Sequence, residues 1–191
     1  TFAAQAGQTA LVHAAAGGVG LFLCQWLASK GVNVIGTVGS DAKKDTILQH
    51  GAKHAVNYKT ENFTEVAREV TGGAGVDVVY DSVGKDHWQG SIDAIRPRGY
   101  MVNFGNASGP LPPIDSVELN VKGSLFFTKA SMRFYQLTRQ ELDDSAATLF
   151  AAIAAGDIKP IIGQTYKLED AAQAQIDVWE GKTTGSTVLS V

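Results

Sequence analysis

A glycine-rich turn near the start of the chain is the segment best suited to hold a ligand. The strand-like run Leu11–Ala16 leads into Gly17, Gly18 and Gly20, and a helical pattern follows at once. Glycine at 17 lets the backbone approach a pyrophosphate, glycine at 20 lets the helix pack closely on its strand, and the helix start offers unpaired N–H groups to an anion. The spacing departs from G-x-G-x-x-G at its first position, Ala15. It predicts a dinucleotide-binding corner, but the same small residues also suit simple packing of a helix on a strand.

The residues after the second strand-like run indicate which dinucleotide would fit. NAD-preferring folds carry an Asp or Glu there, which accepts a hydrogen bond from the ribose 2′-OH, whereas residues 36–40 of this chain contain no carboxylate. Lys43 and Lys44 follow in the first turn of the next predicted helix, where an ammonium would meet a 2′-phosphate. The pattern favours NADPH. The alternative for the lysines is a solvated helix face, and Asp41 either caps the helix or repels a phosphate.

Composition is that of a soluble globular protein. The 191 residues are 45% hydrophobic and carry a net charge of -3, and the lysines and arginines form no basic stripe. Nucleic acid is therefore not an expected partner. The single cysteine, Cys24, has no disulfide partner in the chain, and no secretory signal or membrane-spanning run is evident. These features predict no membrane association and a cytoplasmic location.

Short β-branched runs alternate with amphipathic segments, which predicts βαβ units. The expected fold class is α/β, a Rossmann-like, doubly wound parallel sheet of six strands in which the last two strands follow each other directly. The predicted strands are Thr9–His13, Asn33–Val38, His54–Asn57, Val76–Asp81, Tyr100–Phe104 and Ser124–Thr128. The predicted helices begin near Gly18, Ser40, Glu61 and His87 and end near Ser29, Gly51, Val70 and Ile95, and Ser40-Asp41 is expected to be the capping pair of the second.

The pattern changes after residue 130. A helix is predicted over about 139–155, capped by Thr138, and another over about 168–180, with a strand at Ser186–Val191. The Lys159–Ile162 run has no evident partner strand. We therefore divide the chain into an NADP-binding domain, 1–130, and a tail, 131–191, that returns toward a mostly absent catalytic domain.

Five motifs recur in an order typical of one family, at residues 12–20, 35–39, 56–58, 79–84 and 104–106. With them the chain resembles the zinc-independent quinone oxidoreductases, the zeta-crystallin-like branch of the medium-chain dehydrogenase/reductase family. The resemblance implies an NADPH-dependent reductase that delivers the C4 hydride to a quinone or enone. It also implies that the family's N-terminal catalytic domain is missing, so that this segment alone would turn over poorly.

The resemblance implies cofactor contacts along the whole cleft. It places the pyrophosphate at Ala16, Gly17, Gly18 and Val19, the 2′-phosphate at Gly39, Lys43, Tyr58 and Lys182, and the nicotinamide half at Ser82, Phe104, Gly105, Asn106, Phe126 and Phe127. Simpler interpretations stay open for some of them. Tyr58 also suits a half-buried aromatic at a strand end, and residues 81–84 also suit an Asx turn.

No catalytic residue and no metal ligand is predicted. The histidines at 13, 50, 54 and 87 show no close ligand pairing with one another or with Cys24. Hydride transfer needs no protein nucleophile.

The resemblance also implies a homodimer joined through the apolar edge strand 124–128. Two other functions stay open: an enoyl or other double-bond reductase module, and a non-catalytic NADPH-binding or structural protein.

Overall fold

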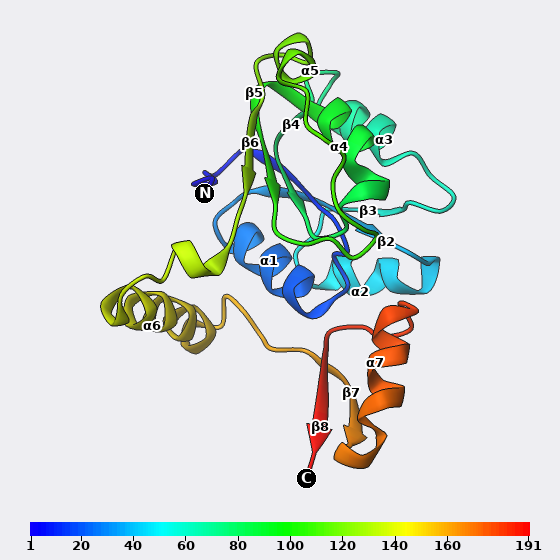
Figure 1. The fold of residues 1–191 in the computed structure, drawn as a ribbon, viewed down its shortest axis with the longest axis vertical. Coiled ribbons are helices and arrows are strands. Elements are labelled where there is room, and N and C mark those ends of the chain that lie inside the picture. The colour runs from blue at the N-terminus through cyan, green and yellow to red at the C-terminus, as the bar shows by residue number, and fades with distance from the viewer.

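The chain is described over residues 1–191 by a computed structural model, shown in Figure 1. The strands are β1 (Thr9–Val12), β2 (Asn33–Val38), β3 (His54–Asn57), β4 (Val76–Asp81), β5 (Ile95–Asn103), β6 (Phe126–Lys129), β7 (Ile162–Lys167) and β8 (Ser186–Ser190). The α-helices are α1 (Gly18–Ser29), α2 (Lys44–Gln49), α3 (Phe63–Val70), α4 (Trp88–Ala94), α5 (Ser116–Val121), α6 (Arg139–Ala155) and α7 (Ala171–Trp179). Short 3-10 turns are η1 (Asp41–Lys43), η2 (Lys85–His87), η3 (Met132–Phe134) and η4 (Leu168–Asp170).

Strands β1 to β6 form one parallel sheet in the order β3-β2-β1-β4-β5-β6. The predicted Rossmann-like fold is confirmed. The direct connection predicted between the last two strands is wrong, because α5 lies between β5 and β6. Parallel neighbours require such a crossover, since the chain must return to the amino edge of the sheet before the next strand begins.

Both faces of the sheet are covered by helices, and β1 shows how the sequence supports this. Ala10 and Val12 belong to the core beside α1 and α2, whereas Leu11 belongs to the core beside α3 and α4. Successive strand residues point to opposite faces, so a strand buried on both sides reads as a continuous apolar run.

Two glycines allow the first strands and helix to approach closely. A Cβ on Gly20 would lie 2.3 Å from the Ala14 carbonyl oxygen, so only glycine fits there. A Cβ on Gly36 would lie 2.8 Å from the Ala15 Cβ. The missing side chain at 36 thus leaves room for alanine at the first position of the glycine motif.

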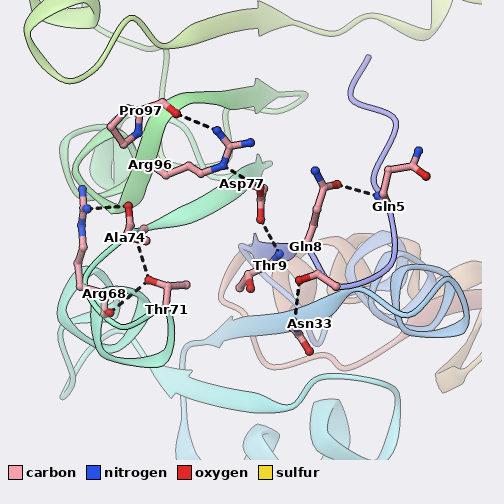
Figure 2. A network of polar contacts seen from close by, with 12 residues as sticks. Gln5, Gln8, Thr9, Asn33, Arg68, Thr71, Ala74, Asp77, Arg96 and Pro97 are labelled. Atoms are coloured by element: carbon pink, nitrogen blue, oxygen red, sulfur yellow. Dashed lines mark hydrogen bonds and ion pairs between the residues drawn. The ribbon is translucent and has the colours of Figure 1, made fainter.

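Polar contacts join the amino-terminal edge of the sheet (Figure 2). The Asp77 carboxylate accepts from the Thr9 backbone N–H at 2.8 Å and from Arg96 Nε at 2.7 Å. On α3, Arg68 donates to the carbonyl of Ala74 at 3.1 Å. These contacts tie β1, β4 and β5 together at the edge opposite the strand ends that carry ligands in this fold class.

The tail forms a small unit of its own. β7 and β8 pair in parallel, with α7 as the crossover between them. The prediction that no tail strand has a neighbour in the chain is therefore wrong: the strand at 162–167 begins where the Lys159–Ile162 run ends, and it finds its partner 20 or more residues later. Helix α6 is capped by Thr138 as predicted, in a capping box with Glu141, and stands to one side of the sheet in Figure 1. None of the helices is both long enough and apolar enough to cross a bilayer.

Candidate functional site

A cavity of about 660 Å³ lies between the carboxyl ends of the first strands and the tail. The sheet contributes the residues Ala14, Ala16, Gly17, Gly18, Val19, Val38, Gly39, Ser40, Lys43, Tyr58, Lys59 and Val83. The tail contributes Val178, Glu180, Gly181, Thr183, Gly185, Ser186 and Thr187. Of the residues predicted to bind the cofactor, the glycine-turn set and the set at Gly39, Lys43 and Tyr58 are brought together here.

The start of α1 faces this cavity without a side-chain cap. Gly17 is the N-cap residue and has no side chain to satisfy the first N–H groups of the helix. Gly18 and Val19 follow in the first turn, and Val19 is 65% exposed. The first turn of a helix carries unpaired N–H groups and a partial positive charge, which together suit an anion.

The tail crosses the glycine turn and closes the cavity from the other side. The Gly185 N–H donates to the Ala16 carbonyl at 2.8 Å, and Gly185 pairs with Gly17 as a β-bridge. The tail residues that line the cavity were not predicted from the sequence. The only signal for them in the sequence is the glycines at 181 and 185, which both adopt positive φ.

Lys43 projects from η1 into the contact between the sheet and the tail. Its Nζ donates to the carbonyl oxygens of Gly181 and Thr183, each at 2.6 Å. Partial burial holds the pKa of this ammonium below its usual value, and the charge of Lys59 adds to the effect. An ammonium partly removed from water and beside a second cation is well placed to gain from an anionic ligand.

Tyr58 stands at the end of β3 and faces Gly39 across the cavity wall. A Cβ on Gly39 would lie 3.0 Å from the Tyr58 hydroxyl oxygen, so any side chain at 39 would crowd the phenol. Tyr58 is 39% exposed, and its ring packs edge-on against His87 with centroids 4.8 Å apart. The ring is thus fixed at its base while the residue stays partly open to solvent.

The predicted capping role of Ser40 and Asp41 is wrong. Neither side chain caps the helical segment that follows. Asp41 instead accepts from Asn57 Nδ2 at 3.2 Å and lies 3.4 Å from Lys44 Nζ, which also pairs with Glu61. The tight turn η1 makes the difference, because it turns the Asp41 carboxylate toward β3 and toward Lys44.

Lys182 lies beside the cavity but does not line it. Its Nζ pairs with Glu180 at 2.6 Å and with Asp177 at 3.3 Å, and these two carboxylates raise its pKa. Its neighbour Gly181 is the wall residue.

Of the residues predicted for the nicotinamide half, Ser82 and the segment 104–106 lie in two loops outside the cavity. Ser82 and Gly105 are in direct contact, since a Cβ on Gly105 would lie 2.6 Å from the Ser82 carbonyl oxygen. Phe104 and Asn106 flank this contact in the loop after β5. The Asx turn considered for residues 81–84 is present, because the Asp81 carboxylate accepts from the backbone N–H of Val83 at 2.7 Å.

Phe126 and Phe127 direct their side chains away from these loops. Phe126 stacks on Tyr100 with ring centroids 4.6 Å apart, and Phe127 packs edge-on against Trp88. Both lie in the first half of β6. The residue at the carboxyl end is Lys129, which the sequence analysis missed. Extending the predicted strand by one residue would have found it.

The expectation that the histidines do not group is wrong. His13, Asp81 and His87 are all buried, with ligand atoms within 4.8 Å of one another. Both nitrogens of His13 are engaged, however: Nδ1 lies 2.9 Å from Thr37 Oγ1 and Nε2 lies 2.9 Å from Ser91 Oγ. The sequence did not show this grouping because the three residues meet only when β1 and β4 become neighbours.

The hydrogen bonds fix the tautomer of His13. Ser91 Oγ donates to the His87 carbonyl at 2.7 Å, so it must accept from His13 Nε2–H, and Nδ1 then accepts from Thr37. Burial, and next the neighbouring His87, hold the pKa of His13 well below its usual value. Burial likewise lowers the pKa of His87, against the opposing charges of two aspartates, and His87 Nδ1 has no partner. A neutral His13 joins β1, β2 and α4 through both of its ring nitrogens. Neither of these two nitrogens has a lone pair free for a metal.

Comparison with known families identifies the chain. Residues 18–144 match the family described as zinc-binding dehydrogenases. The chain belongs to that family. The match begins at the first residue of α1 and runs through the sheet into α6.

Within this family the chain is similar to quinone oxidoreductases, as predicted. It is 46% identical to a Pseudomonas aeruginosa quinone oxidoreductase over 99% of this chain and 58% of that protein. It is 45% identical to a 2-haloacrylate reductase from Burkholderia sp over 96% of this chain and 55% of that protein. The Escherichia coli quinone oxidoreductase solved with NADPH superposes with a TM-score of 0.95 at 43% identity, over 100% of this chain and 59% of that one. The chain thus spans under two thirds of the length of these relatives.

Proposed function

We propose that the chain binds NADPH in the cavity and forms the cofactor half of a reductase that transfers hydride to quinones or related conjugated carbonyls. One observation carries this proposal: the cavity joins an uncapped helix start to Lys43 and Tyr58. A dinucleotide phosphate needs such a combination of backbone N–H groups and cations. The NADPH complex of the Escherichia coli relative supports the choice of cofactor.

The pyrophosphate would lie against the first turn of α1. Gly17 and Gly18 place no side chain between the backbone and the cavity, Val19 would contribute its N–H, and Ala16 would line the approach. Gly20 would act indirectly, by letting the helix sit close enough to β1 for its start to face the cavity. This arrangement holds a doubly charged group with backbone dipoles rather than with side chains.

The 2′-phosphate would lie between Lys43 and Tyr58, over Gly39. No carboxylate stands where an NAD-binding fold would present one to the ribose, and the Asp41 carboxylate lies beside Lys44. Binding would let Lys43 exchange a tail carbonyl for a phosphate oxygen. Lys182 would contact the 2′-phosphate only after its ammonium leaves Asp177 and Glu180.

NADPH, when bound, supplies the hydride, and the residues of this chain orient it and exclude water. Ser82 and the loop Phe104–Asn106 stand at the carboxyl ends of β4 and β5 and would hold the nicotinamide half. The backbone of β6 at Phe126 and Phe127 would extend this wall. We assign no proton-donating residue within the chain.

A titration tests the proposal. NADPH and NADH are added separately to the purified chain, to Lys43→Ala and to the matched control Lys44→Ala, with cofactor fluorescence as the signal. We expect NADPH to bind at least about tenfold more tightly than NADH, because a charge-assisted bond contributes roughly 1.5–3 kcal/mol. Lys43→Ala should lose most of this preference and Lys44→Ala should keep it. Equal affinity for the two cofactors in the unmodified chain would contradict the proposal.

Reduction of an activated carbon–carbon double bond is the second candidate. The 2-haloacrylate reductase, at 45% identity, supports it. Both reactions would use the same cofactor half, so the two candidates differ only in the molecule that accepts the hydride. Turnover of a simple quinone but not of an α,β-unsaturated acid would favour the first candidate, and the reverse result would favour the second.

We also propose a homodimer joined through β6. This strand pairs only with β5, so its outer edge is open, and Phe126 is 50% exposed there. Open apolar edges favour strand pairing between chains. Light scattering should report a dimer for the chain and a monomer for Phe126→Lys, whereas a monomer in both would contradict this interface.

We propose the cytoplasm as the compartment. Cys24 is a free, buried thiol whose pKa burial raises to about 12. Such a thiol is inert, and a chain held together without disulfides suits a reducing compartment.

A further inference from the structure

Lys129 places an ammonium group at the carboxyl end of the last strand of the sheet. It is the final residue of β6 and pairs in register with Asn103, the final residue of β5. Its Nζ donates to Asn103 Oδ1 at 2.5 Å and to Asn106 Oδ1 at 2.6 Å. Two neutral carbonyl oxygens hold the ammonium, and no salt bridge neutralises it.

The position of this charge is set by buried groups. Asn103 is fully buried, and its Nδ2 donates to Asp81 Oδ2 at 2.7 Å and to the Gly105 carbonyl at 2.9 Å. With both of its donors fixed, the amide presents its oxygen to Lys129. A long side chain that would otherwise be mobile is therefore oriented by the sheet.

A series of contacts connects the cavity wall to the Lys129 ammonium, which lies on the side away from Lys43. Val83, in the loop after β4, is part of the cavity wall. The next residue, Gly84, lies against Asn106, since a Cβ on Gly84 would be 3.2 Å from the Asn106 Cα. Asn106 in turn accepts from Lys129. The three loops therefore form one continuous surface from the glycine turn to the end of β6.

The strand order decides which half of a dinucleotide meets this surface. Lys43 and Tyr58 follow β2 and β3, on one side of the crossover point between β1 and β4, and Lys129 ends β6, on the other side. A dinucleotide binds across that point, with one nucleotide on each side. If the 2′-phosphate lies at Lys43, the nicotinamide half must extend toward Lys129.

Resting on the proposed function, we infer that Lys129 makes this chain discriminate between the two redox states of its cofactor. The nicotinamide ring of NADP⁺ carries a positive charge and that of NADPH is neutral, while their phosphates are the same. An ammonium beside the ring repels the oxidised form only. Lys129 therefore strengthens binding of NADPH relative to NADP⁺ and so favours entry of the reduced cofactor and release of the oxidised one.

The buried Asp81 carboxylate has the opposite sign and lies behind Asn103. Its charge stays in place when Lys129 is replaced. The change in discrimination on removing the ammonium therefore isolates the contribution of Lys129.

The test measures the dissociation constants of NADPH and NADP⁺ by fluorescence and calorimetry, and needs no turnover. The variants are Lys129→Met, which keeps the length of the stem, Lys129→Gln, which keeps a hydrogen-bond donor, and Lys129→Arg, which keeps the charge. Lys53→Met is the matched control, because Lys53 contacts Asn33 at the amino end of β2, away from the site. Circular dichroism confirms that each variant is folded.

We expect the ratio of the NADP⁺ to the NADPH dissociation constant to fall about fourfold in both neutral variants, as for two unit charges about 5 Å apart in water. The ratio should stay unchanged in Lys129→Arg and Lys53→Met. An unchanged ratio in the neutral variants, with NADPH binding still dependent on Lys43, would overturn this inference and leave the proposed function standing. Failure of the unmodified chain to bind either cofactor would overturn both.

Discussion

The sheet region, residues 1–130, and the tail, residues 131–191, share the walls of one cavity but differ in how they are held together. The sheet region contains both hydrophobic cores. In the tail the buried residues are only Ala152, Ile158, Ala174 and Gly185. A two-stranded sheet with one covering helix has little stability of its own. The comparison shows that a segment without a core can still shape a site when it is fixed to a rigid neighbour.

The tail is attached to the sheet region by a few polar contacts, two groups of them at the cavity and one on α1. The Gly185 N–H bonds to Ala16, the carbonyls of Gly181 and Thr183 bond to Lys43, and the Lys159 N–H bonds to Gln25 Oε1 at 2.9 Å. The outer face of α7, by contrast, leaves Trp179 84% exposed. The tail is therefore held to the sheet region mainly where it meets the proposed cofactor site.

The largest expected effect comes from truncating the same residue type in each region. Ile35 is fully buried in β2, whereas Ile176 is 48% exposed on α7. We expect Ile35→Ala to lower the free energy of unfolding by about 3–4 kcal/mol, through lost burial and a residual cavity. Ile176→Ala should change it by less than about 0.5 kcal/mol. Urea denaturation measures both values. Similar losses of unfolding free energy at the two positions would contradict the proposed difference between the two regions.

The second effect is a loss of stability in mild acid that belongs to the sheet region, because all four histidines lie there. His13 and His87 have pKa values below the ordinary 6.5 in the folded chain. Below about pH 6.5 the unfolded state therefore binds more protons than the folded state, and the free energy of unfolding falls. The slope is at most about 1.4 kcal/mol per pH unit for each histidine.

Denaturation at several pH values between 7 and 5 measures this slope. The variant His87→Phe keeps a ring of similar size against Tyr58 and Phe63 and should reduce the slope by the share of one histidine. A slope that is the same in the variant would show that His87 does not contribute.

The smallest effect concerns the attachment of the tail. Lys43→Met removes both hydrogen bonds to the tail carbonyls, and we expect the Gly185 amide to lose about fivefold of its protection from hydrogen exchange. A fivefold loss of protection equals about 1 kcal/mol of local stability. This is less than a buried hydrogen bond to a charged group contributes, because the Lys43 ammonium is only partly removed from solvent. Lys44→Met is the matched control and should leave Gly185 protected. Equal protection in all three proteins would mean that the tail is held by other contacts.

Most of the sheet, and the residues from the sheet region that line the cavity, could be predicted from the sequence. Short apolar runs such as Thr9–Val12, alternating with amphipathic segments, favour strands buried on both faces. Glycines 17 and 20 act through local backbone geometry. Lys43 and Tyr58 could be predicted because they follow consecutive strands, whose carboxyl ends meet at one edge of a parallel sheet.

Contacts between distant parts of the chain could not be predicted and depend on the tertiary fold. The pairing of β7 with β8, the meeting of His13 with Asp81 and His87, and the contact of Lys43 with the tail all join residues distant in the chain. Lys129 shows the same limit, since it ends an ordinary strand and gains its partners only from the register of β6 against β5. Periodicity and turn chemistry report the local preferences of a chain, whereas the register and order of strands depend on packing free energy summed over the whole fold.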